Sequence, residues 1–450
     1  MSRTLLRSSR VITGDAVIPA IVVVDGERIV ELRAHDDTRG ETVEDLDPFV
    51  LAPGLVDTHV HINEPGRTDW EGFATATAAA ATGGVTTLVD MPLNCIPVTT
   101  SAEALRIKLA AAAPQLAIDV GFWGGVVPGN ADDLPALVRA GALGCKAFMI
   151  HSGIDEFPDV GEAELRTAML RLRDAHAPLL AHAELDLGAH VHEPDPRKYS
   201  GYLQSRPHEW EDAAIALLIR LCRETGCAVH VVHLSSADSL PQIRAARAEG
   251  LPLTVETCAH YLCLSAEQVP DGDTTFKCAP PIREAENRER LWAGLRDGAI
   301  DFVVTDHSPC VPALKGRERG DFHAAWGGIA SLQLGLAAVW CEASARGVTL
   351  PELFAWLSAR PAAFAGLAAR KGRIAPGMDA DLIAWDPDAT FTLQPERLRF
   401  RHPISPYLGR TLRGEVHRTW LRGAIVYDIG EAGARTGHGR PLLHRDRGDR

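Results

Sequence analysis

Eight short apolar segments, separated by stretches long enough for helices, dominate the middle of this 450-residue chain. They lie at Leu55–His61, Val85–Met91, Ile118–Trp123, Gly144–Ile150, Leu179–Glu184, Ala228–Leu234, Leu253–Cys258 and Phe302–His307. Helices are expected between most of them, for example at Glu71–Ala81 and Glu209–Glu224. Strands that are apolar throughout and alternate with helices are typical of a parallel sheet covered on both faces. Eight such units predict an α/β chain with a (β/α)8 barrel rather than an open, doubly wound sheet.

Both ends of the chain read as strands of a different kind. Between residues 11 and 32, β-branched runs alternate with Gly-Asp and Asp-Gly pairs, which is typical of hairpins. Similar short runs return between residues 371 and 430. We expect residues 1–52 and 372–430 to form one small composite β-sandwich domain around a barrel at 53–371, with two unrelated β extensions as the alternative. The Gly- and Arg-rich residues 431–450 are expected to form a flexible tail.

The composition limits the classes of function. Asp and Glu (59) outnumber Lys and Arg (46), whereas a nucleic-acid-binding protein carries a basic surface. The sequence contains no run of eighteen or more apolar residues, so no transmembrane helix is expected. The first residues also lack the apolar segment of a secretory signal. Nine cysteines without framework spacing fit reduced thiols. We therefore expect a soluble cytoplasmic protein that binds neither nucleic acid nor membranes.

Polar side chains gather where the apolar segments end, and in a barrel this is the catalytic face. His59 and His61 close the first strand and point to the same side, because side chains alternate along a strand. His182, His233 and Asp306 lie at the ends of the fifth, sixth and eighth strands. Each histidine alone is more often a residue at the edge of the core. Together on converging strands, they predict a site for divalent metal.

Lys146 is the most unusual residue of the set. Only six of the 46 basic residues are lysines, and Lys146 lies inside an apolar strand, where an ammonium is costly to bury. A snorkelling lysine or a buried ion pair is the structural alternative. The functional interpretation is an amine that carbon dioxide converts to an anionic carbamate able to bridge two metals, which arginine cannot do. The scarcity of lysine favours this second interpretation.

The chemistry follows from the types of ligand. Imidazole and carboxylate ligands without a thiolate cluster favour zinc, with manganese, cobalt or iron as alternatives. Two neighbouring metal ions activate water and polarise a carbonyl oxygen. The Asp306 carboxylate can accept a proton from the attacking water and pass it to the leaving nitrogen. This set of residues predicts hydrolysis of an amide-like bond.

At these residues the chain resembles the amidohydrolase superfamily, and within it the cyclic amidohydrolases: allantoinases, hydantoinases or dihydropyrimidinases, and dihydroorotases. The resemblance runs from about residue 8 to 428 and rests on the motifs GLVDTHVHINEPGRTDWEG, TTLVDMPLN, GCKAFM, VHVVHLSSA, VETCAHY, KCAPPIR, VTDHSPC and KGRIAPGMDADL. It implies a (β/α)8 barrel with a β-sandwich from both termini, and two divalent metal ions, most readily zinc, bridged by N6-carboxylated Lys146. The implied metal ligands are His59, His61, Lys146, His182, His233 and Asp306, and Asp306 is also the implied catalytic residue.

Two positions discriminate within this branch. Asn63 stands where dihydroorotases carry an arginine for the substrate carboxylate, and His151 stands where hydantoinases usually carry a tyrosine. The stretches HINEPGRTDWEG, DMPLN, DHSPC, AWGGIASLQ and RHPISPYLGRTLRG resemble the allantoinases in particular. The resemblance therefore implies hydrolysis of the cyclic ureide allantoin to allantoate, a step of purine and ureide catabolism, and by analogy a homotetramer.

The resemblance also implies substrate contacts. Backbone groups of Cys278, Ala279 and Gly327 are expected to bind the ring amide, and Asn63 and Asn94 the ureido group; for each, the alternative is a turn residue that caps its own backbone. A hydantoinase or dihydropyrimidinase remains the first functional alternative, although these polar residues favour a polar substituent. A non-catalytic amidohydrolase-like scaffold protein is the second, and the complete set of ligands argues against it.

Overall fold

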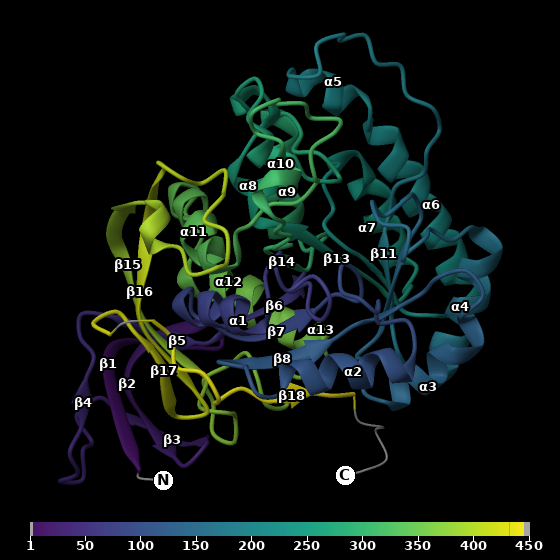
Figure 1. Cartoon of the computed structure of the whole chain (residues 1–450). Coiled ribbons are helices and arrows are strands. Elements are labelled where there is room, and N and C mark those ends of the chain that lie inside the picture. The colour runs from purple at the N-terminus through teal and green to yellow at the C-terminus, as the bar shows by residue number, and fades with distance from the viewer. Residues whose placement is uncertain (1–2, 432, 445–450) are drawn as a thin grey trace.

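The computed structural model describes residues 3–431 and 433–444 of the chain. Two parallel sheets are built from the middle of the chain, apart from the short strand β18 near the C-terminus, and one largely antiparallel sheet is built from the two ends. Figure 1 shows the antiparallel sheet at the lower left and the parallel strands, with helices around them, in the rest of the molecule. The predicted α/β fold with parallel strands is confirmed.

All eight apolar segments form strands, and each pairs in parallel with its neighbours. The two sheets have the orders β14-β13-β12-β11-β10-β9 and β18-β8-β7-β6. Their strands are β6 (Leu55–Val60), β7 (Val85–Asp90), β8 (Asp119–Phe122), β9 (Gly124–Gly125), β10 (Cys145–Phe148), β11 (Leu179–His182), β12 (Val229–Val231), β13 (Leu253–Cys258), β14 (Phe302–Val304) and β18 (Pro441–Leu442).

The two parallel sheets meet at two places, between β8 and β9 and between β6 and the segment after β14. β8 and β9 are consecutive parts of one stretch, and β8 pairs with β7 while β9 pairs with β10. On the other side, Val60 of β6 forms a parallel bridge with His307, which follows β14, and the His61 N–H donates to the His307 carbonyl at 2.8 Å. The carboxyl ends of the first and last apolar strands therefore lie side by side.

Helices cover the outside of the parallel strands (Figure 1). The predicted helices are found as α1 and α6, and Gly226, with a φ of 69°, ends α6 in the left-handed conformation typical of a C-cap. No helix among the described residues is long and apolar enough to cross a bilayer. The helices are α1 (Phe73–Thr82), α2 (Ala102–Ala112), α3 (Leu134–Arg139), α4 (Glu162–Asp174), α5 (Tyr199–Gln204), α6 (His208–Thr225), α7 (Leu240–Ala248), α8 (Ala259–Cys263), α9 (Ala285–Arg296), α10 (Pro312–Lys315), α11 (Gly335–Ala345), α12 (Leu350–Phe354) and α13 (Arg360–Phe364).

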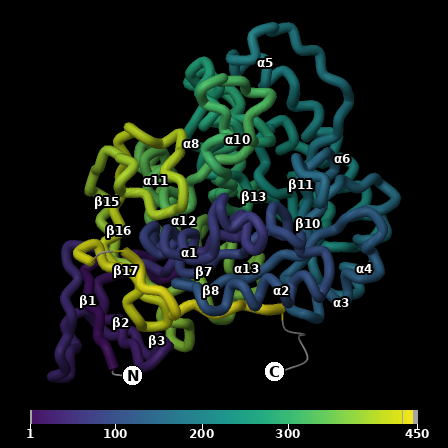
Figure 2. The backbone as a smooth tube through the Cα atoms, in the orientation of Figure 1, coloured from purple at the N-terminus to yellow at the C-terminus, as the bar shows by residue number. Residues whose placement is uncertain are grey.

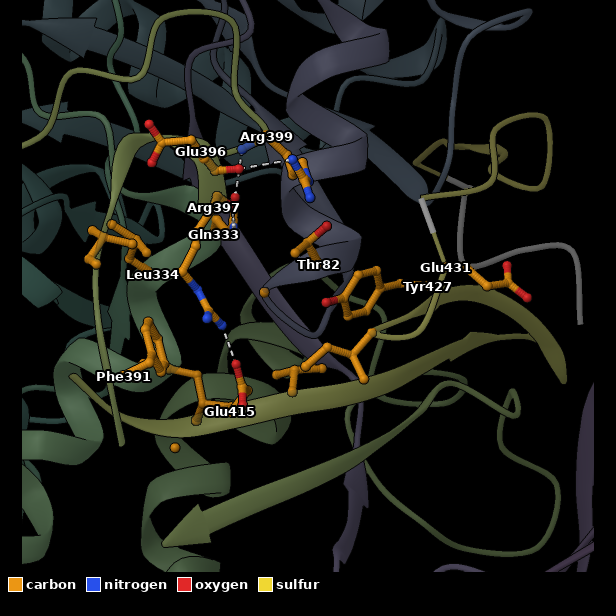
Figure 3. Close-up of a pocket in the computed structure, with 17 residues that line it drawn as sticks. Thr82, Gln333, Leu334, Phe391, Glu396, Arg397, Arg399, Glu415, Tyr427 and Glu431 are labelled. Atoms are coloured by element: carbon orange, nitrogen blue, oxygen red, sulfur yellow. Dashed lines mark hydrogen bonds and ion pairs between the residues drawn. The ribbon is translucent and has the colours of Figure 1, made fainter. Parts of the chain in front are cut away.

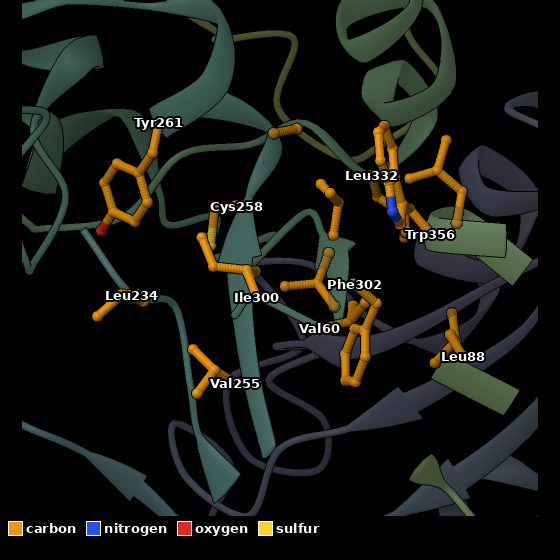
Figure 4. Close-up of a cluster of buried hydrophobic side chains, with 14 of the residues drawn as sticks. Val60, Leu88, Leu234, Val255, Cys258, Tyr261, Ile300, Phe302, Leu332 and Trp356 are labelled. Atoms are coloured by element: carbon orange, nitrogen blue, oxygen red, sulfur yellow. The ribbon is translucent and has the colours of Figure 1, made fainter. Parts of the chain in front are cut away.

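Apolar side chains pack on both sides of the parallel strands, which explains why these segments read as apolar throughout. Figure 4 shows part of this core, where Val60 of β6, Val255 of β13 and Phe302 of β14 lie among side chains of other elements such as Trp356. All of these residues are buried. All nine cysteines are free thiols, eight of them buried, as expected for a chain without a disulfide framework.

Strands from both ends of the chain form the third sheet, in the order β17-β16-β15-β5-β1-β2-β3, with β4 paired to β1. The purple and yellow traces lie together at this sheet in Figure 2. Gly14, with a φ of 60°, lies in the two-residue loop of the predicted β1–β2 hairpin, a position that glycine adopts without strain. The strands are β1 (Thr4–Thr13), β2 (Ala16–Asp25), β3 (Arg28–Ala34), β4 (Glu44–Asp45), β5 (Val50–Pro53), β15 (Leu382–Thr392), β16 (Thr411–Leu421) and β17 (Ala424–Asp428).

The described part of the predicted flexible tail, residues 433–444, is packed against the protein, and in this respect the structure corrects the prediction. β18 pairs with β8, and the Arg440 N–H donates to Asp119 at 2.8 Å. A Cβ on Gly439 would lie 2.0 Å from the Ile118 carbonyl oxygen, so only glycine allows this close approach. The polar composition misled the prediction because it is the backbone of this segment that finds partners on β8, while the Arg440 guanidinium pairs with Glu27 near the surface. Residues 432 and 445–450 of the predicted tail lie outside the described residues.

A buried ion cluster connects the parallel strands to the third sheet. The Lys371 Nζ lies 2.7 Å from Asp119 of β8, 3.0 Å from Asp379 and 2.6 Å from Asp381, just before β15. Lys371 is only 2% exposed, so its ammonium and these carboxylates depend on each other for solvation.

We predict that Lys371→Met lowers the free energy of unfolding by about 3–5 kcal/mol, because it leaves the buried Asp381 without a cation, whereas Asp119 keeps Arg422 and Asp379 keeps Arg28 and Arg370. Urea denaturation followed by circular dichroism measures the effect. Lys198→Met is the matched control, since Lys198 is an exposed lysine paired with Asp271 and its loss is expected to cost less than about 1 kcal/mol. Equal shifts for the two variants would contradict the prediction.

Candidate metal centre

The six predicted ligands come together at the carboxyl ends of the parallel strands. Five of them line one cavity of about 400 Å³. The sixth, His59, is fully buried and contacts two of the others. The five that line the cavity are His61, Lys146, His182, His233 and Asp306.

The first and last strands supply one half of the centre. The Asp306 Oδ1 lies 3.2 Å from the His59 Nε2 and 3.5 Å from the His61 Nε2. Ligand atoms of these three residues all lie within 4.8 Å of one another, a spacing that suits one cation. The Lys146 Nζ lies 3.1 Å from the His59 Nε2, so the amine adjoins this half of the centre.

His182 and His233 form the other half. Their ring centroids lie 4.6 Å apart, and the His233 ring lies 5.3 Å from that of His59. The His233 Nδ1 is buried and has no hydrogen-bond partner among the described residues, which is costly unless a ligand occupies it. His233 and Asp306 both have a positive φ, 41° and 46°, a strained backbone that is characteristic of functional sites.

Burial sets the charge of these groups. It lowers the pKa of His59 to about 3 and also lowers that of His61, His182 and His233, so the rings are neutral and offer lone pairs. Burial lowers the pKa of Lys146 to about 8, so part of its amine is neutral near pH 7. Burial opposes ionisation of Asp306, but the surrounding histidines hold its pKa well below the usual range. Four neutral imidazoles, a carboxylate and a reactive amine fit a divalent metal centre.

Two buried glutamates that the sequence reasoning missed orient the histidines. The Glu256 Oε1, on β13, lies 2.5 Å from the His59 Nδ1. The Glu184 Oε2 lies 2.7 Å from the His182 Nε2, and Arg206 holds that carboxylate through two hydrogen bonds. A histidine that donates one ring N–H to a carboxylate presents its other nitrogen to a metal. The signal that could have found Glu256 is the one that singled out Lys146, a charge inside an apolar strand.

Asn94 adjoins a ligand as well as the cavity. Its amide lies 3.3 Å from the His61 Nδ1, and its Oδ1 is buried without a partner among the described residues. Turning the amide over would let the Oδ1 accept the Nδ1 proton, which leaves the His61 Nε2 free to bind a metal. Asn94 is thus placed to orient His61 as well as to meet a substrate.

The other predicted substrate contacts divide into two groups. Ala279 and Gly327 line the cavity, and Cys278 is buried beside them with its carbonyl accepting from the Tyr202 hydroxyl at 2.7 Å. Asn63 is not among the lining residues: its Nδ2 donates to the Pro309 carbonyl at 3.1 Å, and its φ of 68° is that of a turn. Asn63 therefore binds a distant carbonyl rather than its own backbone, its buried Oδ1 has no partner among the described residues, and its contact with a substrate stays a prediction.

Another cavity, of about 470 Å³, lies between α1 and the third sheet (Figure 3). Arg397 forms an ion pair with Glu415 across it, beside Phe391 of β15. None of its 17 lining residues, all of them described, is a histidine or a cysteine. Its titratable acids are three glutamates, so metal binding by histidines points to the cavity at the strand ends instead.

The chain is similar to known proteins over nearly its whole length. The sequence profile of the Amidohydrolase family matches residues 50–426. The chain is 51% identical over 431 residues to the allantoinase of Streptomyces avermitilis, covering 95% of this chain and 96% of that protein. It is 46% identical to the allantoinase of Saccharomyces cerevisiae, covering 95% and 92%. Among solved structures, the L-hydantoinase (dihydropyrimidinase) from Arthrobacter aurescens superimposes with a TM-score of 0.90 at 27% identity, covering 98% and 100%.

We predict that Glu256→Gln weakens metal binding by roughly 10–100-fold, because the carboxylate that fixes the ring nitrogens of His59 is lost. Competition with a chelator measures the affinity. Glu249→Gln serves as the control, since Glu249 pairs with Arg223 at the surface. An unchanged affinity in a folded Glu256→Gln protein would show that this contact does not orient the ligand.

Proposed function

The chain belongs to the amidohydrolase family, and from this premise we propose that it hydrolyses the cyclic amide bond of allantoin to give allantoate. The observation that carries the proposal is the convergence of four neutral histidines, one buried lysine and one carboxylate on a single cavity. Allantoinases 51% and 46% identical over 95% of the chain support the choice of substrate.

We propose two divalent metal ions, most readily zinc, as the cofactor. Their ligands would be His59, His61, His182, His233, Asp306 and, as the bridge, N6-carboxylated Lys146. When bound, the ions would polarise the scissile carbonyl and activate water. The neutral Lys146 amine is the form that adds to carbon dioxide: the new N–C bond gives a carbamate, and one proton is released to solvent.

Asp306 is the proposed proton carrier. Because its carboxyl stays ionised, it can accept a proton when water attacks the amide carbon. The same proton then passes to the ring nitrogen as the C–N bond breaks, so the product is an open-chain carboxylate with an N–H at the former ring position. The Ser308 hydroxyl donates to the Asp306 Oδ1 at 2.9 Å and keeps the carboxylate in place.

The cavity wall favours a polar substituent on the ring. One end of the Asn94 amide faces His61, the other is buried without a partner among the described residues, and leaving such a group unpaired costs about 1–3 kcal/mol. A ureido group could satisfy it, whereas an apolar substituent could not. Backbone groups of Ala279 and Gly327 are proposed to bind the ring amide.

The parallel pairing that continues from β6 through β14 and back to β6 supports the expected (β/α)8 barrel. We propose residues 53–371 as this barrel, and 1–52 with 372–430 as the composite β-sandwich domain. The paired strands from both ends of the chain support that division. The homotetramer and the cytoplasmic location stay predictions.

We expect the purified protein loaded with zinc to turn over allantoin faster than 5-phenylhydantoin, dihydrouracil or dihydroorotate. Initial rates at matched substrate concentrations decide between these cyclic amides. A preference for 5-phenylhydantoin would make the protein a hydantoinase, and no turnover of any of them would favour the scaffold alternative.

We also predict that Lys146→Ala loses activity by several orders of magnitude together with bound metal, because the bridging carboxylate is gone. Short carboxylic acids such as propionate are expected to restore part of both. Lys198→Ala, which changes an exposed lysine, is the control. Full activity of Lys146→Ala without added acid would mean that Lys146 is an ordinary lysine.

A further inference from the structure

Another buried lysine, Lys315, lies behind the wall of the cavity. Lys315, the last residue of α10, is 5% exposed, and its Nζ contacts four backbone carbonyl oxygens. Those of Thr274, Lys277 and Trp326 lie 3.4, 3.3 and 3.0 Å away, and that of Gly328 lies closer still. No carboxylate of the described residues forms an ion pair with it. The groups in direct contact with the charge are therefore peptide dipoles, and Asp273 attracts it from a longer distance.

Three of these carbonyls, those of Lys277, Trp326 and Gly328, belong to the two stretches of backbone that line the cavity. Lys277 precedes Cys278 and Ala279, and Trp326 and Gly328 flank Gly327. The Gly328 N–H donates to the Lys277 carbonyl at 2.8 Å, so the two stretches are also joined directly. The Lys315 Nζ therefore contacts both stretches of backbone at the place where they are joined.

The direction of these carbonyls fixes the direction of the neighbouring N–H groups. In a trans peptide the C=O and the following N–H point in opposite directions. The Trp326 carbonyl faces Lys315, so the Gly327 N–H points away from it, and the same holds for the Lys277 carbonyl and the Cys278 N–H. Neither N–H donates to any described residue. Gly327 lines the cavity, so its N–H is available to a ligand there.

The chemistry at this point suits an ammonium. Lysine presents a compact charge with three donors, whereas the planar guanidinium of arginine needs more room and fixed acceptor directions. A cluster of carbonyl oxygens is also the environment in which proteins hold small monovalent cations. Lys315 thus acts as an internal cation between two segments of backbone.

We propose that Lys315 is a positioning residue for the reaction: its ammonium turns the Trp326 and Lys277 carbonyls away from the cavity, so that the Gly327 and Cys278 N–H groups face the carbonyl oxygens of the substrate ring. This inference rests on the proposed function, because it assigns these N–H groups to the cyclic amide that the metal centre hydrolyses.

The test compares Lys315→Met and Lys315→Ala with the zinc-loaded wild-type protein. We expect KM for allantoin to rise about tenfold in Lys315→Met, the loss expected for one well-oriented hydrogen bond, while zinc content stays at the wild-type value. Ammonium or methylammonium is expected to lower the KM of Lys315→Ala again, and tert-butylammonium at the same ionic strength is not. Lys198→Met is the control for loss of a lysine outside the site.

A wild-type KM in folded, zinc-loaded Lys315→Met would overturn the proposal. So would a fall in kcat alone, without rescue by small cations, because that pattern describes a purely structural lysine. If Lys315→Met does not fold, Lys315→Arg keeps the charge and carries the test: a raised KM supports the proposal and a wild-type KM refutes it. If the wild-type protein prefers another cyclic amide, the same constants are measured with that substrate, which separates this inference from the choice of allantoin.

Discussion

The arrangement of the candidate metal centre depends on the free-energy cost of burying the amine of Lys146. Lys146 lies on an interior strand with its Nζ 3.1 Å from a neutral imidazole, and burial lowers its pKa to about 8. An ammonium there is poorly solvated, whereas a carbamate that binds two cations turns the same position into a source of binding energy. The neutral histidines, the ionised Asp306 and the glutamates behind the rings all complement metal cations at this point.

The surroundings of the six lysines partly correct the argument that the scarcity of lysine singles out Lys146. Five of the six lysines are buried, so burial alone does not single out Lys146. The others have oxygen partners: Lys108 and Lys371 contact carboxylates, and Lys277 and Lys315 contact backbone carbonyls. Among the described residues, Lys146 is the buried lysine that has neither. The lack of an oxygen partner, more than the rarity of lysine, is what supports the proposed carbamate on Lys146.

Residues at strand ends were predictable because alternation and the parallel fold bring them to one edge. His59, His61 and Asp306 meet for this reason. Glu256 was missed because its partner His59 lies almost 200 positions away in the chain, and only the packing of β13 beside the centre brings them together. The partners of Asn63 and of residues 439–442 could not be predicted, because local polarity does not reveal which distant carbonyl or carboxylate a side chain or a backbone N–H meets.

A crystal structure of the zinc-loaded protein tests the central claim most directly, with anomalous scattering recorded at the zinc edge. We predict two anomalous peaks, one beside His59 and His61 and the other beside His182 and His233. We also predict planar density for a carbamate that extends from the Lys146 Nζ to both peaks. A single peak beside an unmodified lysine, or no peak in the cavity, would contradict the account.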